Sequence, residues 1–233
     1  MGKRIITQAR GKGSLTYKVR RKAFKHKIKY PMKEGEAEII NLFHSSGHTA
    51  PLLKIKVDNE VFINPAFDGA FIGQKMFIGK DKAETGNILM IKHVPIGTPV
   101  FNIEKNPGDG GKMIRVGGSS AVIFKEYPRN KISILTPKKK EVKLSGDCRV
   151  SVGIIAGAGR IQKPVLTAGR RYYKMKSRGK LWPRTSAVCM NAIDHPFGSG
   201  RGKRIKAKIA KRNAPPGRRV GQLRPKRTGR RKK

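Results

Sequence analysis

Between Glu34 and about Leu144, the apolar residues come in short runs that turn residues interrupt. Runs of this kind, bounded by Gly, Asp, Asn and Pro, are typical of β-strands. Asp58 and Asn59 separate two of the runs and predict a hairpin. Strands are predicted in E-A-E-I-I-N-L-F, P-L-L-K-I-K-V, E-V-F-I, Q-K-M-F-I, N-I-L-M-I, A-V-I-F, K-I-S-I-L and E-V-K-L.

Many short strands with glycine-rich turns favour small antiparallel barrels, because closure removes exposed strand edges. The strand-rich stretch is longer than one five-stranded barrel needs, and it suits two. The turn-rich segment H-V-P-I-G-T-P-V at residues 93–100 is the expected seam between them. The predicted fold class is therefore mainly β, with two small barrels.

Helix is scarce in this pattern, and one short basic helix is predicted after Lys163. Pro164 suits a first helical position, and V-L-T-A-G-R-R-Y-Y-K-M-K follows without another proline. Of the few aromatic residues that lie among charges, some are expected to pack in the core, Tyr172 or Tyr173 first among them. The others are candidates for stacking on bases.

The distribution of charge indicates the function more directly than the hydrophobic pattern does. The 233 residues hold 54 Lys+Arg against 14 Asp+Glu, a formal net charge of +40, which predicts a polyanionic partner. Residues 1–33 have 12 basic side chains and no acid, residues 34–159 have 17 against 13, and residues 160–233 have 25 against 1. A nearly balanced middle between two basic ends indicates folded material with two basic arms.

The two cysteines, Cys148 and Cys189, fit neither a disulfide framework nor the paired spacing of a zinc site. They are expected to be buried in a protein of a reducing compartment. The N-terminus lacks an apolar core of signal-peptide length, and no window approaches the roughly 20 apolar residues of a membrane span. A cytoplasmic protein without membrane contact is expected.

Two glycine-rich segments invite a comparison with phosphate-binding loops. In G-I-I-A-G-A-G-R the third glycine of a dinucleotide fingerprint would fall at Gln162, and in N-P-G-D-G-G-K the position of the first P-loop glycine is Asn106. Nucleotide chemistry is therefore not predicted. The glycines are expected to let the backbone approach phosphate or sugar, with Lys112, Arg115 and Arg160 beside them; ordinary tight turns remain the alternative.

An Asp-His pair stands at residues 194 and 195, against the basic tail. A hydrolase would need a nucleophile and an orienting acid that converge in space, and Ser199 is the nearest hydroxyl in sequence. Adjacent residues of an extended segment point in opposite directions, so the pair is a poor triad. No catalytic residue is assigned, and a hydrogen-bonding His195 before Pro196 is the preferred interpretation.

Several motifs together resemble the universal large-subunit ribosomal protein of the L-two family, in its archaeal or eukaryotic-type form. Ser199 and Arg201 stand where relatives often have glycine. The resemblance covers nearly the whole chain and rests on M-G-K-R-I, N-P-G-D-G-G-K, A-G-A-G-R, K-M-K-S-R-G-K-L-W-P, V-C-M-N-A-I-D-H-P-F-G, R-N-A-P-P-G-R-R-V-G and K-R-T-G-R.

The resemblance implies an arm at residues 1–33, an oligonucleotide-binding-type barrel at 34–93, an SH3-like barrel at 94–170 and a basic extension at 171–233. It implies a structural, non-enzymatic component of the large ribosomal subunit. Such a protein is a primary rRNA binder near the peptidyl-transferase centre, with Asp194, His195 and Pro196 toward that centre, and supports subunit association. Neighbouring ribosomal proteins and the small subunit would be its further partners. No homo-oligomer and no cofactor are expected, although RNA could bring structural magnesium.

The rivals are a general basic nucleic-acid-binding protein outside the ribosome, such as a DNA compactor, and an independent hydrolase that uses His195. No metal ligands are predicted. The predicted RNA-binding residues are Lys3, Arg4, Arg10, Lys12, Lys112, Arg115, Arg160, Lys174, Lys176, Arg178, Trp182, His195, Arg201, Lys203, Arg204, Arg212, Asn213, Arg218, Arg219, Lys226 and Arg227.

Overall fold

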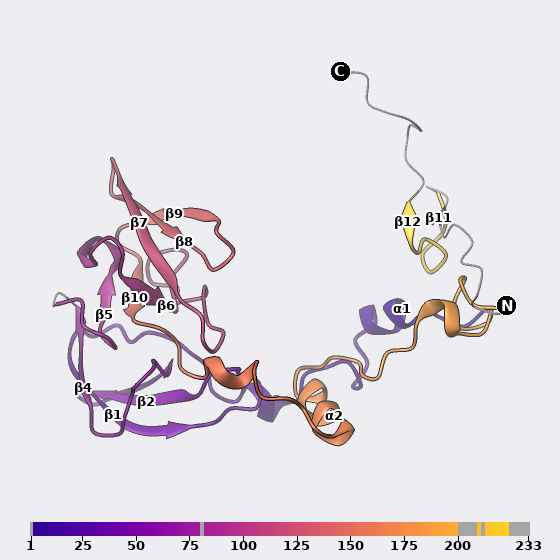
Figure 1. The fold of residues 1–233 in the computed structure, drawn as a ribbon, viewed down its shortest axis with the longest axis horizontal. Coiled ribbons are helices and arrows are strands. Elements are labelled where there is room, and N and C mark those ends of the chain that lie inside the picture. Colours follow the sequence, from indigo (N-terminus) through magenta and orange to yellow (C-terminus); the bar gives the residue numbers. More distant parts are fainter. Residues whose placement is uncertain (1, 80–81, 200–208, 211–212, 224–233) are drawn as a thin grey trace, which may run out of the picture. The chain divides into compact units, whose positions relative to one another are not determined.

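The computed structural model describes residues 2–79, 82–199, 209–210 and 213–223 (Figure 1). The chain forms two compact units. The sheet unit consists of residues 20–167, and the extension unit combines residues 1–19 with residues 168–233.

The sheet unit contains one mixed sheet of ten strands, in the order β3-β2-β1-β4-β5-β10-β6-β7-β8-β9. Strands β4 and β5 run parallel, and the other neighbours run antiparallel. The strands are β1 (Gly35–Phe43), β2 (Leu52–Val57), β3 (Glu60–Pro65), β4 (Lys75–Gly79), β5 (Ile88–Met90), β6 (Pro99–Phe101), β7 (Ala121–Tyr127), β8 (Lys131–Leu135), β9 (Glu141–Ser145) and β10 (Arg149–Val152). Three short 3-10 helices accompany them: η1 (Arg21–Phe24), η2 (Ile91–His93) and η3 (Ala158–Arg160).

All eight predicted strands are present, and the mainly β class is confirmed. The hairpin at residues 58–59 is confirmed as well, since Val57 pairs with Glu60 and Asp58 adopts a left-handed φ of 47°. Asp tolerates this conformation better than most residues do. Strands β6 and β10 were not predicted, because runs of three or four residues are too short to show an alternating pattern.

Two hydrophobic cores lie in the sheet unit and meet along its central strands. On β5, Ile88 packs in the first core and its neighbour Leu89 in the second. On β6, Phe101 packs in the first core and Val100 in the second. Successive side chains of a strand point to opposite faces, so these strands form a wall that both cores share.

A buried polar network joins the two sides of this wall. The Tyr30 hydroxyl donates to the carbonyl oxygen of Asn102 at 2.7 Å and lies 2.9 Å from the Ser151 hydroxyl. The Asn64 side-chain amide donates to the Ser151 hydroxyl at 2.9 Å, and its oxygen accepts from the side-chain amide of Asn102 at 2.7 Å. Each group thus has the partner that burial requires. Burial also raises the pKa of Tyr30.

Residues 28–31 lie within the sheet unit as a strap. Lys29 forms a β-bridge with Ile63, and the Arg149 guanidinium donates to the carbonyl oxygen of Pro31 at 2.6 Å. Ala23 and Tyr30 are 3% and 2% exposed. The four-part division made from the sequence stays a prediction, but residues 20–33 pack with the sheet rather than apart from it.

The extension unit is mostly irregular chain with short elements. Its described residues bury only two hydrophobic side chains, Ile5 and Ala210. The elements are α1 (Ile6–Gly11), α2 (Ala168–Lys176), the 3-10 helix η4 (Ala187–Cys189) and the two-residue parallel strands β11 (Ile209–Ala210) and β12 (Gln222–Leu223).

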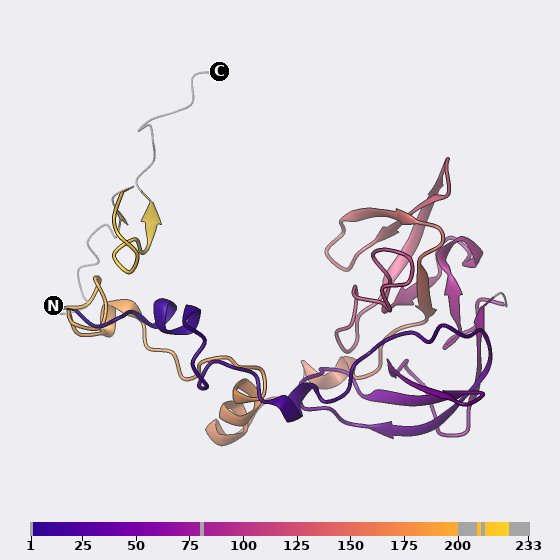
Figure 2. The same ribbon diagram turned by 180° about the vertical axis from the view of Figure 1, so that it is seen from behind.

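The two stretches of the extension unit, one before residue 20 and one after residue 167, are distant in sequence but run side by side in both views (Figure 1 and Figure 2). At one place the backbone of Gly179 passes so close to that of residues 17–19 that a Cβ there would lie 2.9 Å from the Tyr17 carbonyl oxygen. At another, the amide of Lys3 donates to the carbonyl oxygen of Ile193 at 2.8 Å. The N-terminal and C-terminal basic segments therefore contact each other.

The start of helix α2 and the surroundings of its two tyrosines differ from the predictions. Helix α2 begins at Ala168 rather than at Pro164, directly after Thr167, whose residue type is favoured at the N-cap. Tyr172 and Tyr173 of this helix are 40% and 67% exposed, so they do not pack in a core. The helix contains no buried residue because the extension unit offers no apolar face for it.

The cysteines differ from the expectation in one case. Cys148 is buried in the second core, and burial raises the pKa of its thiol to about 11. Cys189 is exposed, because η4 lies in the extension unit, which has almost no core. Of the helices in the described ranges, none has the length and apolarity that crossing a membrane requires.

Candidate nucleic-acid interface

His195 lies in a tightly folded loop at residues 190–199, which we call the DHP loop. The amides of Asp194 and His195 both donate to the carbonyl oxygen of Asn191, at 3.0 and 3.2 Å. The amide of Gly198 donates to the His195 carbonyl oxygen at 2.8 Å. A Cβ at Gly198 would collide with the Asn191 carbonyl oxygen, so this turn requires glycine.

The position of one hydrogen bond determines the tautomer of His195. The amide of Phe197 donates to His195 Nδ1 at 3.1 Å, so in the neutral ring Nδ1 is the acceptor and Nε2 carries the proton. The ring also packs edge-on against Phe197, with centroids 5.0 Å apart. His195 therefore has its Nε2–H as a donor for a partner.

This arrangement does not support the hydrolase alternative. In a Ser-His-Asp triad a carboxylate accepts from the second ring nitrogen of the histidine. At His195 that nitrogen faces a backbone N–H instead. The neighbouring carboxylate, Asp194, forms an ion pair with Lys3 at 3.6 Å.

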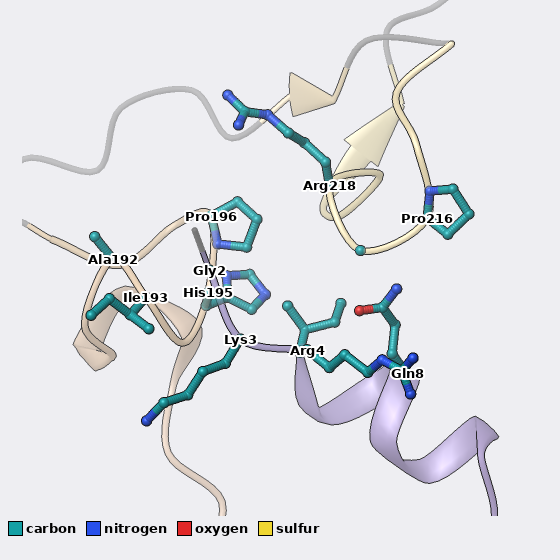
Figure 3. Close-up of a pocket in the computed structure, with 12 residues that line it drawn as sticks. Gly2, Lys3, Arg4, Gln8, Ala192, Ile193, His195, Pro196, Pro216 and Arg218 are labelled. Atoms are coloured by element: carbon teal, nitrogen blue, oxygen red, sulfur yellow. The ribbon is translucent and has the colours of Figure 1, made fainter.

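A cavity of about 460 Å³ lies beside His195 within the extension unit (Figure 3). Residues of the N-terminal segment, the DHP loop and the turn at 216–218 line it together. The lining includes Lys3, Arg4, His195 and Arg218 and contains no acidic residue. Figure 3 shows that the side chains of Lys3 and Arg218 point outward from the ring of His195, so they extend the basic surface around the cavity.

The glycine-rich loop at residues 106–112 is organised around the buried carboxylate of Glu104. The amides of Gly108 and Gly110 donate to its two oxygens at 3.2 and 3.0 Å. The amide of Lys112 donates to the Ile103 carbonyl oxygen at 2.9 Å. The prediction that these amides contact phosphate is thus corrected for this loop, because a carboxylate and a carbonyl of the protein already accept from them.

Strand β10, which packs in the second core, also holds the Glu104 carboxylate through Arg149. The amide of Arg149 donates to it at 2.9 Å, and the Arg149 guanidinium forms an ion pair with it at 3.2 Å. Glu104 is fully buried, and buried charges are stable in proteins when they are paired and hydrogen-bonded. The loop is therefore fixed on a rigid base.

Lys112 and Arg115 follow this loop and have different surroundings. The Lys112 side chain is exposed and lies 3.3 Å from Asp109. Burial alone would raise the pKa of Asp109, but the Asn106 amide and the Lys112 ammonium outweigh it and lower that pKa. Lys112 thus remains at the surface, where RNA could reach it.

The half-buried side chain of Arg115 points into the protein, and its role in RNA binding stays a prediction. Its Nε donates to the Asn102 side-chain oxygen at 2.8 Å, and Nη2 lies 3.4 Å from the carbonyl oxygens of Ile28 and Gly110. Burial lowers the pKa of its guanidinium. The sequence pattern showed a cation beside glycines but could not show which way it points.

The other predicted residues fall into three groups. Arg160 is half-buried and donates to the Gly117 carbonyl oxygen at 3.3 Å, and Lys176 lies over the ring of the exposed Tyr172. Arg178 and Trp182 are also half-buried. The exposed ones besides Lys112 are Lys3, Arg4, Arg10, Lys12, Lys174, Asn213, Arg218 and Arg219. Those outside the described residues are Arg201, Lys203, Arg204, Arg212, Lys226 and Arg227.

Sequence reasoning missed the residues that hold this surface in place. Tyr30, Asn102, Glu104 and Arg149 are isolated polar residues in the sequence, and nothing in their spacing indicates that they meet. One signal was available for Glu104, an acid that directly follows the mainly apolar run V-F-N-I. No group of three or more potential metal ligands occurs in the part of the chain that the structure describes.

Comparisons with known proteins agree with the motifs. The family model described as Ribosomal Proteins L2, C-terminal domain, matches residues 84–217. Large ribosomal subunit protein uL2 of Archaeoglobus fulgidus is 41% identical over 98% of this chain and 99% of its own length. The proteins of the same name from Hyperthermus butylicus and Natronomonas pharaonis are 41% and 38% identical, over 100% and 99% of this chain and 100% and 97% of their own lengths. The chain belongs to the family of large ribosomal subunit protein uL2.

Proposed function

We propose that the protein is a structural, non-enzymatic component of the large ribosomal subunit that binds its rRNA directly. The observation that carries this proposal is the extension unit, which combines a high density of Lys and Arg with almost no core. Residues 160–233 contain one acid, Asp194, and Lys3 pairs with it. A surface of this kind needs a polyanion, and the membership of the relatives in the large ribosomal subunit supports ribosomal RNA as that polyanion.

The sheet unit supports the finer fold proposal of two barrels. Five strands frame each core, β1 to β5 the first and β6 to β10 the second, while Leu89 of β5 and Phe101 of β6 pack in the neighbouring core. Five strands a core is the number that an oligonucleotide-binding-type barrel uses. We assign that type to residues 34–93 and an SH3-like type to residues 94–170, with the basic segments 1–33 and 171–233 as RNA-binding extensions.

Within the subunit, the DHP loop is proposed to lie toward the peptidyl-transferase centre. The protonated Nε2 of His195 would donate to a phosphate or a 2′-hydroxyl. The exposed cations around it would bind the backbone of the same RNA, without base specificity. Support of subunit association and contacts with neighbouring ribosomal proteins and the small subunit belong to the same proposal. Structural magnesium would be held through the RNA.

A binding competition tests this function against a general nucleic-acid binder. The full-length protein is titrated with a large-subunit rRNA fragment and with duplex DNA of equal length, across a range of salt concentrations. Contacts to about ten phosphates would give a log-log slope of about −7 for single-stranded sites and about −9 for duplex. We expect the rRNA to bind more tightly at every salt concentration; equal affinity for any duplex would contradict the proposal.

A truncation locates the electrostatic anchor. Removal of residues 201–233 deletes 16 Lys and Arg, most of which lie outside the described residues. The slope should become shallower for both nucleic acids, because fewer counterions are released. An unchanged slope would show that this tail does not anchor the protein.

A further inference from the structure

The first residues of the chain contact the DHP loop directly. The amide of Lys3 donates to the Ile193 carbonyl oxygen at 2.8 Å, and Lys3 Nζ lies 3.6 Å from the carboxylate of Asp194. Gly2 adjoins the same carbonyl oxygen, since a Cβ there would lie 3.3 Å from it. One end of the chain thus engages the two residues that precede His195.

The same segment also contacts the turn at residues 216–218. Gly217 has a φ of 89°, and a Cβ there would lie 2.7 Å from the side-chain oxygen of Gln8. Between these contacts, Ile5 is 6% exposed, which makes it one of only two buried hydrophobic residues among the described residues of this unit. Residues 2–8 therefore connect two loops that are distant from them in sequence (Figure 3).

The DHP loop needs an external support because it contains no buried residue. Ile193 is 54% exposed, and His195 is only half-buried. Its internal backbone hydrogen bonds fix the shape of the turn, and the Lys3 amide adds a hydrogen bond from a distant part of the chain. A loop without buried apolar contacts opens at little cost in free energy unless neighbours hold it.

We propose that residues 2–5 are a brace that positions the DHP loop, and that the backbone amide of Lys3 is its positioning group. The brace lines the cavity beside His195 and holds the two residues that precede this histidine. The Lys3 ammonium has a smaller role in the brace, because an exposed ion pair at 3.6 Å contributes little. The functional meaning of the brace rests on the proposed function, since it orients a loop toward RNA.

The proposal differs from the simpler view of Lys3 as one more phosphate ligand. In that view the side-chain charge matters and the amide does not. Lys3→Ala removes the charge and keeps the N–H, whereas Lys3→Pro removes both. The comparison of these two variants therefore isolates the amide. Lys18→Ala is the matched control, because it removes one exposed charge from the same N-terminal segment and leaves these contacts in place.

The test is hydrogen exchange of the peptide that covers residues 190–199, in the full-length protein saturated with large-subunit rRNA. Exchange should accelerate roughly fivefold in Lys3→Pro, the factor that one net hydrogen bond contributes. It should accelerate more than tenfold on deletion of residues 2–5, which also removes Ile5. Lys3→Ala should accelerate it much less than Lys3→Pro does, and Lys18→Ala should leave it unchanged.

Two results would overturn the brace: unchanged exchange after the deletion, or equal effects of Lys3→Pro and Lys3→Ala. The affinity for rRNA, measured on the same samples, reports on the proposed function separately. If wild-type protein shows no preference for rRNA but the exchange pattern follows the amide, the brace stands and the proposed function fails. If the wild-type protein prefers rRNA but exchange does not respond to the variants, the proposed function stands and the brace fails.

Discussion

The carboxylate of Glu104 and the guanidinium of Arg149 form a buried ion pair, with Oε1 and Nη2 3.2 Å apart. Four N–H groups converge on this carboxylate, from Gly108, Gly110 and Arg149. Arg149 also donates to Pro31 and lies over the ring of Tyr30. The pair thus ties the glycine-rich loop, the strap at residues 28–31 and strand β10 to one another.

Glu104→Gln should lower the free energy of unfolding by about 3–5 kcal/mol, because it leaves the buried Arg149 charge without its partner. Chemical denaturation of the full-length protein measures this change. The control is Asp147→Asn, which breaks the exposed pair with Lys92 and should barely change stability. Equal effects of the two substitutions would show that burial of the first pair has no energetic consequence.

The hydrophobic pattern predicted most of the sheet, because each strand shows its own two-residue period. Ile55 and Val57 alternate with Lys54 and Lys56, so β2 could be recognised without knowledge of its partners. The pattern could not show that Ile88 and Leu89 face different cores, since both are apolar. That distinction arises only when β10 pairs on one side of β5 and β4 on the other.

The candidate interface was predicted less completely, and for a physical reason. Composition identifies a basic surface, but the direction of a long side chain depends on the acceptors that surround it. Arg115 points inward because Asn102 and two carbonyl oxygens meet there, and Lys112 stays outside beside Asp109. The contact of Lys3 with Ile193 joins residues 190 positions apart, which no local pattern encodes.

The opposite directions of Lys112 and Arg115 predict different consequences for RNA binding. Lys112→Ala should make the salt dependence of rRNA affinity shallower by about one phosphate contact. Arg115→Ala should leave that slope unchanged but destabilise the protein, since the Asn102 side-chain oxygen loses the Arg115 donor. Affinity at several salt concentrations, together with denaturation of each variant, measures both. A shallower slope for Arg115→Ala would place its guanidinium on RNA instead.

The two cysteines should differ strongly in reactivity. A thiol reagent at pH 8 should label the exposed Cys189 quickly and Cys148 only on unfolding, because the thiolate is the reactive form and burial raises the pKa of Cys148 to about 11. Mass spectrometry of the labelled chain measures this, with Cys189→Ser as the control that should show no rapid labelling. Rapid labelling of Cys148 in folded protein would contradict its burial.

The raised pKa of Cys148 also predicts a dependence of stability on pH. The folded state keeps this proton more tightly than the unfolded state, where the thiol titrates near 9. Its contribution to stability is therefore complete below pH 9 and is lost as the pH rises through about 11. Denaturation curves between pH 8 and 11 should show a smaller decline for Cys148→Ala than for wild type.

The contrast between the two units predicts a proteolysis pattern. Without RNA, the extension unit has too little buried apolar surface to offset an ordering cost of roughly 1–2 kcal/mol per residue. Limited proteolysis should therefore remove residues 1–19 and 168–233 and leave residues 20–167, including the strap that Tyr30 anchors. Added rRNA should protect the ends. Cleavage within residues 24–33 of the free protein would contradict the strap, and resistance of the C-terminal segment without RNA would contradict coupled ordering.

The central claim is that this protein is a structural rRNA-binding part of the large ribosomal subunit, with His195 in a positioning role rather than a catalytic one. Sedimentation of the tagged protein in a cell lysate at moderate salt tests it most directly, with wild type and His195→Ala side by side. Both proteins should migrate with large subunits, and an assay of the recovered particles should show a loss of peptide-bond formation or subunit joining only for the variant. A free or chromosome-bound pool of wild-type protein, or variant particles with full activity, would contradict the account.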